Sequence, residues 1–216
     1  MYTLHGFAQS GNTYKVALLL QALSAPWVAR HVPFADFAAG LTRSDAWRDA
    51  HNAMGEVPVL EADGMRLTQS AAILLFLAER HGRYAGSTAA ERQEVLRWLF
   101  FDNHKFTSYL ASWRFMKAFA ATEPDPGVAR WLQGRIASAF EIVEKQLMQR
   151  AFIAGDAPTI ADMSLCGYLH YPADETGIDI AARYPAMFTW LERLKALPGW
   201  TAPYELLPGE RLAPRR

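Results

Sequence analysis

A short polar turn near the amino terminus carries the side chains best suited to chemistry in this sequence. Ser10, Asn12 and Thr13 follow a strand-like stretch that ends at Phe7, and they come just before an apolar helical pattern. A hydroxyl at a helix start can donate a hydrogen bond to an anion, and the helix dipole and free amides favour the same charge. Serine is also a preferred N-cap residue, so Ser10 has a purely structural interpretation as well.

Two further residue pairs stand where a strand and a helix are expected to begin. Pro58 follows Val57 at the head of an apolar run, which suits proline because it cannot donate to a sheet. Gln69 and Ser70 precede a helical pattern, where a hydroxyl and free helix amides can bind a carboxylate. An N-cap role explains Ser70 without any ligand, but it leaves Gln69 unexplained.

The composition argues against several classes of function. The chain of 216 residues has 22 Lys and Arg against 22 Asp and Glu, and its basic cluster is limited to Arg211, Arg215 and Arg216, so nucleic acid is not an expected partner. The longest apolar run, Ala71–Ala78, is far shorter than the roughly 20 residues that span a membrane. No secretory signal is visible, and the single cysteine, Cys166, agrees with a reducing compartment. We expect a cytoplasmic globular protein.

The apolar period alternates between strand and helix over the first 80 residues. The predicted strands lie at 2–7, 28–34, 57–61 and 65–67. Clear helical stripes run over 16–23 and 73–77, and a weak one lies at 44–51. Asp63 and Gly64, between the last two strands, form a hairpin signal. The order β-α-β-α-β-β-α predicts a small open sheet with helices packed on it.

Beyond these strands the pattern is entirely helical. Thr88 with Glu91, and Thr159 with Asp162, have the spacing of capping boxes at helix starts. Asp162 would complete its box inside the helical region, so we expect its loss to damage folding rather than chemistry. The predicted organisation is an α/β domain, a linker and an all-α domain, at residues 1–80, 81–87 and 88–216.

This arrangement resembles the cytosolic glutathione S-transferase family, in its serine-type, bacterial-like form. Four motifs in order carry the resemblance over essentially the whole chain: Ser10–Val16, Asn52–Leu60, Gln69–Ile73 and Thr159–Asp162. The resemblance implies a thioredoxin-like first domain, glutathione as co-substrate, no metal and a homodimer. The implied activity is a detoxifying transferase that adds the glutathione thiolate to hydrophobic electrophiles.

The resemblance also implies a thiol-activating role for the turn that begins at Ser10. An unperturbed thiol has a pKa of about 8.5, and lowering it by about 1.5 to 2 units takes roughly 2 to 3 kcal/mol of preferential thiolate binding. One charge-assisted hydrogen bond and a helix start can supply that. Ser10 is the implied donor, with Asn12 and Thr13 as alternatives.

The remaining glutathione contacts follow from the same resemblance. The Val57–Pro58 bond is implied to be cis, an isomer found in about 5–6% of such bonds, so that the Val57 backbone pairs with the cysteinyl part of glutathione. Ser70 and the helix amides would bind the γ-glutamyl carboxylate, and Gln69 would accept from its ammonium. These residues complete the implied glutathione-binding set, together with Glu56 beside Val57.

Glu56 departs from the pattern of many relatives, which place Lys, Gln or Arg just before the Val–Pro pair. A carboxylate there would repel the glycyl carboxylate of glutathione unless it points away or is offset. His51, Lys15 and Arg66 are nearby sources of positive charge.

A long helix is predicted after Thr88, with apolar residues at helical spacing from Val95 to Trp113, and a pocket for the hydrophobic substrate is expected along this helix and the first helix. Its candidate residues are aromatic: Tyr14, Phe106, Tyr109 and Trp113. Each is explained equally well as a core residue, because aromatic side chains at helical spacing usually pack inside. Tyr109 and Trp113 are favoured, since each has a polar group that can face a wet cleft.

Two alternative functions stay open. A disulfide or peroxide reductase of this fold would use glutathione without a protein cysteine, because the Ser10–Thr13 turn has none and Cys166 lies among apolar residues. A non-catalytic binding protein is the second alternative, because a fold alone does not determine a function. Retention of Ser10, Val57 and Gln69 argues against it, and Glu56 argues for it.

Overall fold

The computed structural model describes residues 1–215 and divides the chain into two units. The first unit holds Met1–Arg83 together with Leu197–Arg211, and the second holds Tyr84–Ala196 and the described residues after Arg211. The residue pattern predicts Leu197–Arg211 to be part of the helical domain, and the structure corrects that boundary. No helix among the described residues is long and apolar enough to cross a bilayer.

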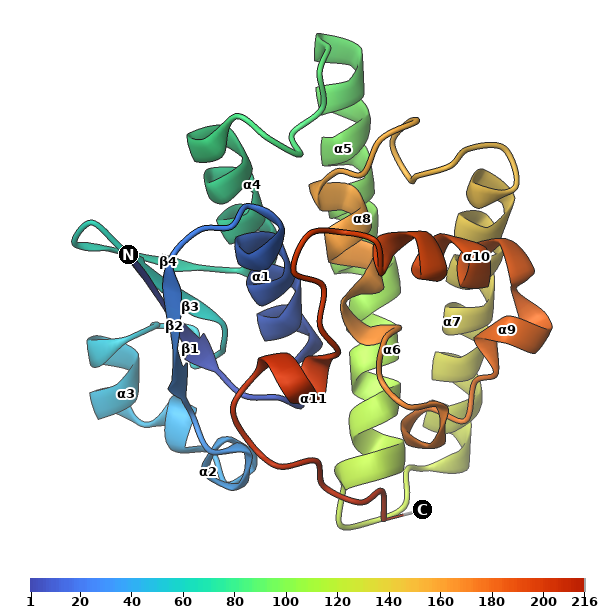
Figure 1. Cartoon of the computed structure of the whole chain (residues 1–216). Helices are drawn as coiled ribbons and strands as arrows, with labels where there is room; N and C mark the ends of the chain where they lie inside the picture. Colours follow the sequence, from blue (N-terminus) through green and yellow to red (C-terminus); the bar gives the residue numbers. More distant parts are fainter. Residues whose placement is uncertain (216) are drawn as a thin grey trace. The chain divides into compact units, whose positions relative to one another are not determined.

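The first unit is built on a four-stranded mixed sheet. Its strands are β1 Tyr2–Gly6, β2 Trp27–His31, β3 Val59–Ala62 and β4 Met65–Thr68. They lie in the order β2-β1-β3-β4, with β1 parallel to β2 and the other two pairs antiparallel (Figure 1). The predicted hairpin links β3 and β4, and the thioredoxin-like fold is confirmed. The third strand begins two residues later than predicted, because Val57 and Pro58 form a cis turn before it.

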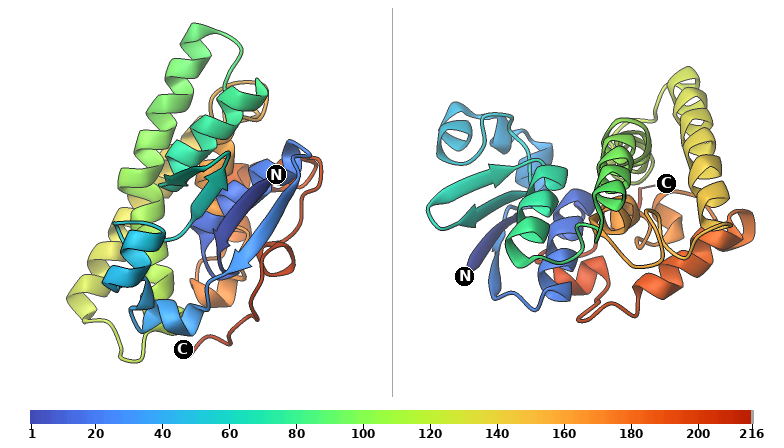
Figure 2. Two further views of the ribbon diagram at one scale, coloured as in Figure 1. Left: turned by 90° about the vertical axis from the view of Figure 1, so that its left-hand side faces the viewer. Right: turned by 90° about the horizontal axis from the view of Figure 1, so that it is seen from above.

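Two helices, α1 Gly11–Ala22 and α4 Ser70–His81, pack together against this sheet (Figure 2). Nearly every side chain of α1 is buried, which explains why its sequence is apolar on more than one face. The connection between β2 and β3 carries α2 Phe34–Ala38, a 3₁₀ turn at Leu41–Arg43 and α3 Asp45–Ala50. This connection packs only a few partly buried aromatic side chains against the sheet unit.

The returning segment Leu197–Arg211 is tied to the turn before α1. It contains α11 Pro203–Leu206. The Ala8 amide donates to the Pro208 carbonyl at 2.9 Å, and Gln9 Nε2 donates to the Glu210 carbonyl at 2.6 Å. These bonds hold the residues that lead directly into Ser10.

The second unit is helical, as predicted. Its α-helices are α5 Ala89–Phe101, α6 Thr107–Arg114, α7 Pro126–Leu147, α8 Ile160–Leu165, α9 Ile180–Arg183 and α10 Pro185–Leu194. Shorter 3₁₀ turns lie at Cys166–Tyr168 and Ala173–Glu175. The long helix predicted from residue 88 contains π-helical turns at Asp102–Phe106 and Phe115–Phe119.

Buried polar groups fix the helices of this unit. Asp102, at the first π-helical turn, accepts hydrogen bonds from Thr107 Oγ1 at 2.6 Å and Ser164 Oγ at 2.5 Å. Arg114 forms an ion pair with Glu175 at 2.5 Å, and both side chains are almost completely buried. The π-helical turn at Asp102 is a local irregularity of the helix, and the spacing of apolar residues does not predict it.

Both predicted capping boxes are present. Thr88 and Glu91 begin α5 at an exposed position. Thr159 and Asp162 begin α8, and there the Asp162 carboxylate is fully buried. The same motif is therefore solvent-exposed at the start of α5 and buried at the start of α8.

Candidate functional site

Ser10 lies at the start of α1, and its hydroxyl hydrogen is available to donate a hydrogen bond. Its Oγ accepts a hydrogen bond from the Thr13 amide at 3.1 Å, which is an N-cap contact. No hydrogen bond donated by this hydroxyl is present among residues 1–215. The residue is 6% exposed. Ser10 therefore caps the helix through a lone pair and can still donate its proton to an anion placed at the helix start.

Asn12 and Thr13, the alternative donors, have different surroundings. Thr13 is fully buried against β1, where a Cβ added to Gly6 would come within 2.3 Å of its methyl carbon. That close packing gives Thr13 a structural position rather than an accessible one. The Asn12 Oδ1 accepts from Ser70 Oγ at 3.4 Å, so Asn12 connects the starts of α1 and α4.

The Val57–Pro58 peptide bond is cis in the structure. The Val57 backbone N–H and C=O form no hydrogen bond within the part of the chain that the structure describes. Asn52 fixes the approach to this bond, because its Nδ2 donates to the Glu56 carbonyl at 2.8 Å and its Oδ1 accepts from the Met54 amide at 3.0 Å. Sequence reasoning did not single out Asn52 as a loop-shaping residue, although an asparagine followed two positions later by an amide donor is a turn signal.

Gln69 is held in a backbone conformation that non-glycine residues seldom adopt, with a φ of 64°. Its Nε2 donates to the Glu56 Oε2 at 3.1 Å and lies 3.0 Å from the Met54 Sδ. Strained residues of this kind cluster at binding sites. Gln69 and Glu56 are thus brought together, and the Glu56 carboxylate is directed toward the start of α4.

The three cations considered as partners of Glu56 have other surroundings. Lys15 is fully buried within α1, and Arg66 lies 4.0 Å from Glu61. His51 packs its ring against His5, with centroids 5.0 Å apart. The Glu56 carboxylate accepts instead from the neutral amide of Gln69. The expectation that His51, Lys15 or Arg66 offsets the charge of Glu56 is therefore not supported.

Two of the aromatic pocket candidates lie in the core. Tyr14 is fully buried and its hydroxyl donates to the Thr201 carbonyl at 3.0 Å. Phe106 is also buried and stacks on Phe140 with ring centroids 5.0 Å apart. Their burial leaves no ring surface for a substrate, so the prediction that they line a pocket is corrected to a packing role.

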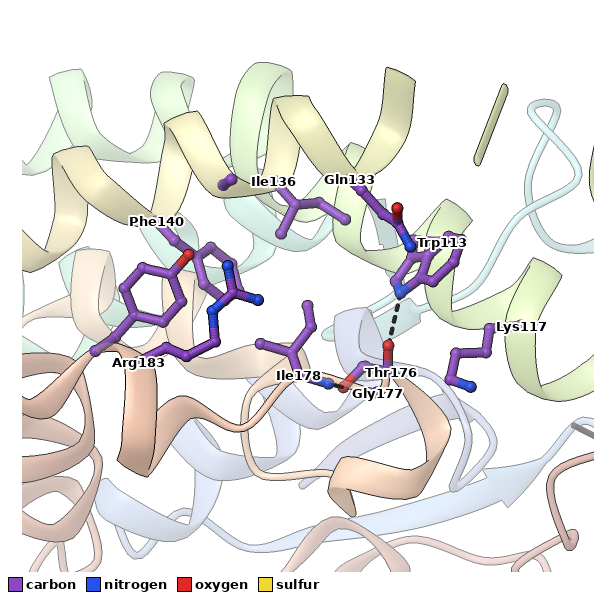
Figure 3. Close-up of a pocket in the computed structure, with 11 residues that line it drawn as sticks. Trp113, Lys117, Gln133, Ile136, Phe140, Thr176, Gly177, Ile178 and Arg183 are labelled. Atoms are coloured by element: carbon purple, nitrogen blue, oxygen red, sulfur yellow. Dashed lines mark hydrogen bonds between the residues drawn. The ribbon is translucent and has the colours of Figure 1, made fainter. Parts of the chain in front are cut away.

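Tyr109 is half-buried on α6, and Trp113 is buried there but 9% exposed. Tyr109 meets Trp131 edge to face at 5.4 Å, and Trp113 Nε1 donates to the Thr176 carbonyl at 2.7 Å. Trp113 lines a cavity of about 490 Å³ within the helical unit. Figure 3 shows Lys117 and Arg183 at opposite ends of this cavity.

The walls between those two cations are largely apolar. They include Ile136, Phe140 and Ile178, and none of the described residues that line the cavity carries a carboxylate. Such a cavity suits an organic molecule with an apolar body and anionic ends. The residue pattern identified one of its walls, Trp113, but it did not indicate the two cations.

The sequence matches two family models. The model "Glutathione S-transferase, N-terminal domain" matches residues 4–88, and "Glutathione S-transferase, C-terminal domain" matches residues 125–193. The chain belongs to the glutathione S-transferase family. Membership agrees with the geometry of the first unit, which contains a cis proline at Val57–Pro58, a serine cap at the start of α1 and a contact between Asn12 and Ser70.

Individual members of this family show how far the likeness extends. The crystal structure of glutathione S-transferase from Pseudomonas fluorescens is 33% identical with a TM-score of 0.83, over 94% of this chain and 98% of that chain. The disulfide-bond oxidoreductase YfcG of Escherichia coli is 26% identical over 89% of each chain. The structure of Ure2p in complex with glutathione shares the fold at 22% identity, with a TM-score of 0.81 over 92% of this chain and 95% of that chain.

Proposed function

We propose that this protein is a glutathione transferase in which Ser10 activates the glutathione thiol for attack on hydrophobic electrophiles. The observation that carries the proposal is the Ser10 hydroxyl, which caps α1 while its proton is committed to no acceptor in the described chain. Family membership and the glutathione complex of Ure2p support glutathione as the co-substrate.

In this mechanism the Ser10 hydroxyl donates to the sulfur and so favours the thiolate over the thiol. The thiol proton leaves to solvent, and the sulfur then forms a bond to an electrophilic carbon by displacement or conjugate addition. Stabilisation of roughly 2 to 3 kcal/mol lowers the thiol pKa by about 1.5 to 2 units, so that about half or more of the bound thiol is ionised at pH 7.

The rest of glutathione would be held by neutral groups and the backbone. The free Val57 N–H and C=O pair with the cysteinyl backbone like an added strand. The α4 amides bind the γ-glutamyl carboxylate, and the Ser70 hydroxyl joins them by giving up its long 3.4 Å bond to Asn12 Oδ1. Gln69 uses its amide hydrogens on Glu56, which leaves its carbonyl oxygen to accept from the ammonium. Glu56 then adds negative charge near that ammonium and away from the glycyl end.

A glutathione-dependent disulfide reductase is the second candidate, and the likeness to YfcG favours it. Cys166 is fully buried, so such a reaction would proceed through glutathione alone. In that reaction one thiolate attacks the disulfide and releases a thiol, and a second glutathione completes the reduction. Assays with an aryl halide and with a small disulfide, each with glutathione, separate the two activities.

Isothermal calorimetry with glutathione tests the common requirement of both candidates. Absence of binding at millimolar glutathione would exclude both of them and leave a non-catalytic protein of the same fold. Light scattering tests the expected homodimer in the same sample.

Substitution of Ser10 tests its role in the transferase. We expect Ser10→Ala to lower turnover and raise the kinetic pKa of bound glutathione, with affinity for glutathione nearly unchanged. Ser10→Gly keeps most of the cap stability and removes the same donor, so it should match Ser10→Ala in the pH profile. Ser138→Ala, at an exposed position of α7, is the matched control. An unchanged pH profile in both Ser10 variants would transfer the role to Asn12 or Thr13.

A further inference from the structure

Two histidines and a glutamate form a cluster in the first unit that the proposed glutathione chemistry does not use. His5 lies on β1, Glu61 on β3, and His51 directly follows α3. One donor atom from each side chain lies within 4.8 Å of the other two. Three elements that are distant in the sequence thus bring nitrogen and oxygen donors to one place.

The hydrogen-bonding state of these histidines is unusual for buried groups. His5 Nε2 and His51 Nδ1 are inaccessible to solvent and form no hydrogen bond within residues 1–215. Glu61 Oε1 lies 3.2 Å from His5 Nε2, so the carboxylate is already close to one of these nitrogens. Buried polar atoms are nearly always partnered, so a cluster of one carboxylate and two histidines that each carry such a nitrogen points to a shared ligand.

We propose that His5, His51 and Glu61 bind a divalent transition-metal ion, with Zn²⁺ as the preferred ion. Two imidazoles and a carboxylate are a donor set that Zn²⁺ accepts, and water completes a four-coordinate site. Metal–ligand distances of about 2.0–2.2 Å place tetrahedral donors about 3.4 Å apart, so the cluster closes by shifts of about 1 Å. The Glu61 side chain is 40% exposed, which leaves it room to rotate toward the ion.

Two arginines face this cluster and oppose a cation. Arg30 on β2 is the register partner of His5, and Arg66 Nε lies 4.0 Å from Glu61 Oε1. Both side chains are exposed, so their charges are screened by solvent. The Arg66 contact is long and exposed, which makes it weak competition for coordination of Glu61. Trp47 packs on the His51 ring at 5.1 Å and covers that side of the cluster.

A bound ion would connect the end of α3 to the sheet. Neither α2 nor α3 contains a fully buried residue, so this segment has few packing contacts that hold it in place. His51 is also the residue before Asn52, which shapes the loop that leads to Val57. The ion therefore acts as a structural staple. It lies outside the residues assigned to glutathione, for which no metal is expected, and it does not depend on the proposed function.

Metal titration of the chelator-treated, tag-free protein tests this site. We expect one Zn²⁺ per chain by calorimetry, and intense visible absorption of four-coordinate Co²⁺ when that ion replaces Zn²⁺. His51→Gln and Glu61→Gln should each weaken binding at least about tenfold. His104→Gln, at an exposed position of the helical unit, is the matched control and should bind as the parent does. Amide exchange over residues 34–51 should slow when Zn²⁺ is present.

The result that overturns the proposal is equally direct. Absence of saturable one-to-one binding, or equal binding by the parent and both site variants, would reduce the cluster to packed side chains. His51→Gln and Glu61→Gln are preferred to changes at His5, since His5 lies within the central strand pair and its loss can unfold the sheet. Circular dichroism of each variant confirms that a loss of binding is not a loss of folding.

Discussion

The buried capping box of α8 provides the sharpest prediction about stability. The Asp162 carboxylate accepts four hydrogen bonds. Its Oδ1 receives the Ile153 amide at 2.8 Å and Trp190 Nε1 at 2.9 Å. Its Oδ2 receives the Thr159 amide at 2.8 Å and the Thr159 hydroxyl at 3.0 Å. One side chain therefore satisfies donors from two loops and from α10.

The expected cost of Asp162→Ala follows from the donors that it leaves unpaired. Two buried amides and one indole N–H lose their acceptor, and each such loss costs about 1–3 kcal/mol. Burial raises the pKa of Asp162 while its hydrogen bonds oppose that rise, so removal of the carboxylate also recovers part of its desolvation cost. Water that enters the gap repairs some of the lost bonds. We expect a net loss of about 3–5 kcal/mol of unfolding free energy.

Urea unfolding, followed by tryptophan fluorescence and circular dichroism, measures this loss. Asp162→Asn should cost less than Asp162→Ala, because its oxygen still serves two donors while its NH₂ group faces the Thr159 amide. Glu91→Ala in the exposed box of α5 is the control, since solvent replaces the carboxylate there. Activity per folded molecule should not change. If Asp162→Ala shifts the urea midpoint no more than Glu91→Ala does, the reasoning from burial is refuted.

Three further predictions concern other buried positions. Glu175→Gln should lower the free energy of unfolding by several kcal/mol, because it leaves the buried Arg114 charge without its ion-pair partner. Adding Arg114→Met should recover much of that loss, and urea unfolding of the single and double variants measures both effects. Burial lowers the pKa of His170 to about 3, compared with 6.5 in the unfolded chain. The unfolded chain therefore binds a proton more readily below pH 6.5, and the free energy of unfolding should be up to about 2 kcal/mol lower at pH 5 than above pH 6.5. Urea unfolding at pH 7 and 5 should show that loss reduced in His170→Gln. Gly6→Ala should lower the thermal midpoint by clashing with Thr13. Adding Thr13→Ala should recover only part of that loss, because it removes the contacts at 2.3 and 2.4 Å and leaves the Thr13 Cβ at 2.9 Å.

Local periodicity was sufficient to predict most of the elements. The strands at β1 and β2 and the hairpin of β3 and β4 follow from short apolar runs with turn residues between them. Both capping boxes follow from the spacing of two residues each. These features depend on interactions within a few residues, which is why a single sequence carries them.

The return of Leu197–Arg211 to the first unit could not be predicted in the same way. Its contacts are backbone carbonyls that accept from Ala8, Gln9 and Tyr14, and a carbonyl is present at every residue. The pairing of Glu56 with Gln69 is a second example, because it depends on the positive φ of Gln69 and on the loop that Asn52 shapes. Both features depend on contacts between segments that are distant in the sequence, and residue type and spacing do not predict such contacts.

The two interpretations of Ser10 from sequence, an N-cap and a thiol activator, are compatible in the structure. Capping uses an oxygen lone pair, which accepts the Thr13 amide at 3.1 Å. Thiol activation uses the hydroxyl proton, and a hydroxyl has both at once. The cap moreover fixes the oxygen at the helix start, where the free amides and the dipole also favour an anion. The bond that gives Ser10 an ordinary structural role is therefore also the bond that would orient its proton toward the sulfur of a bound thiol.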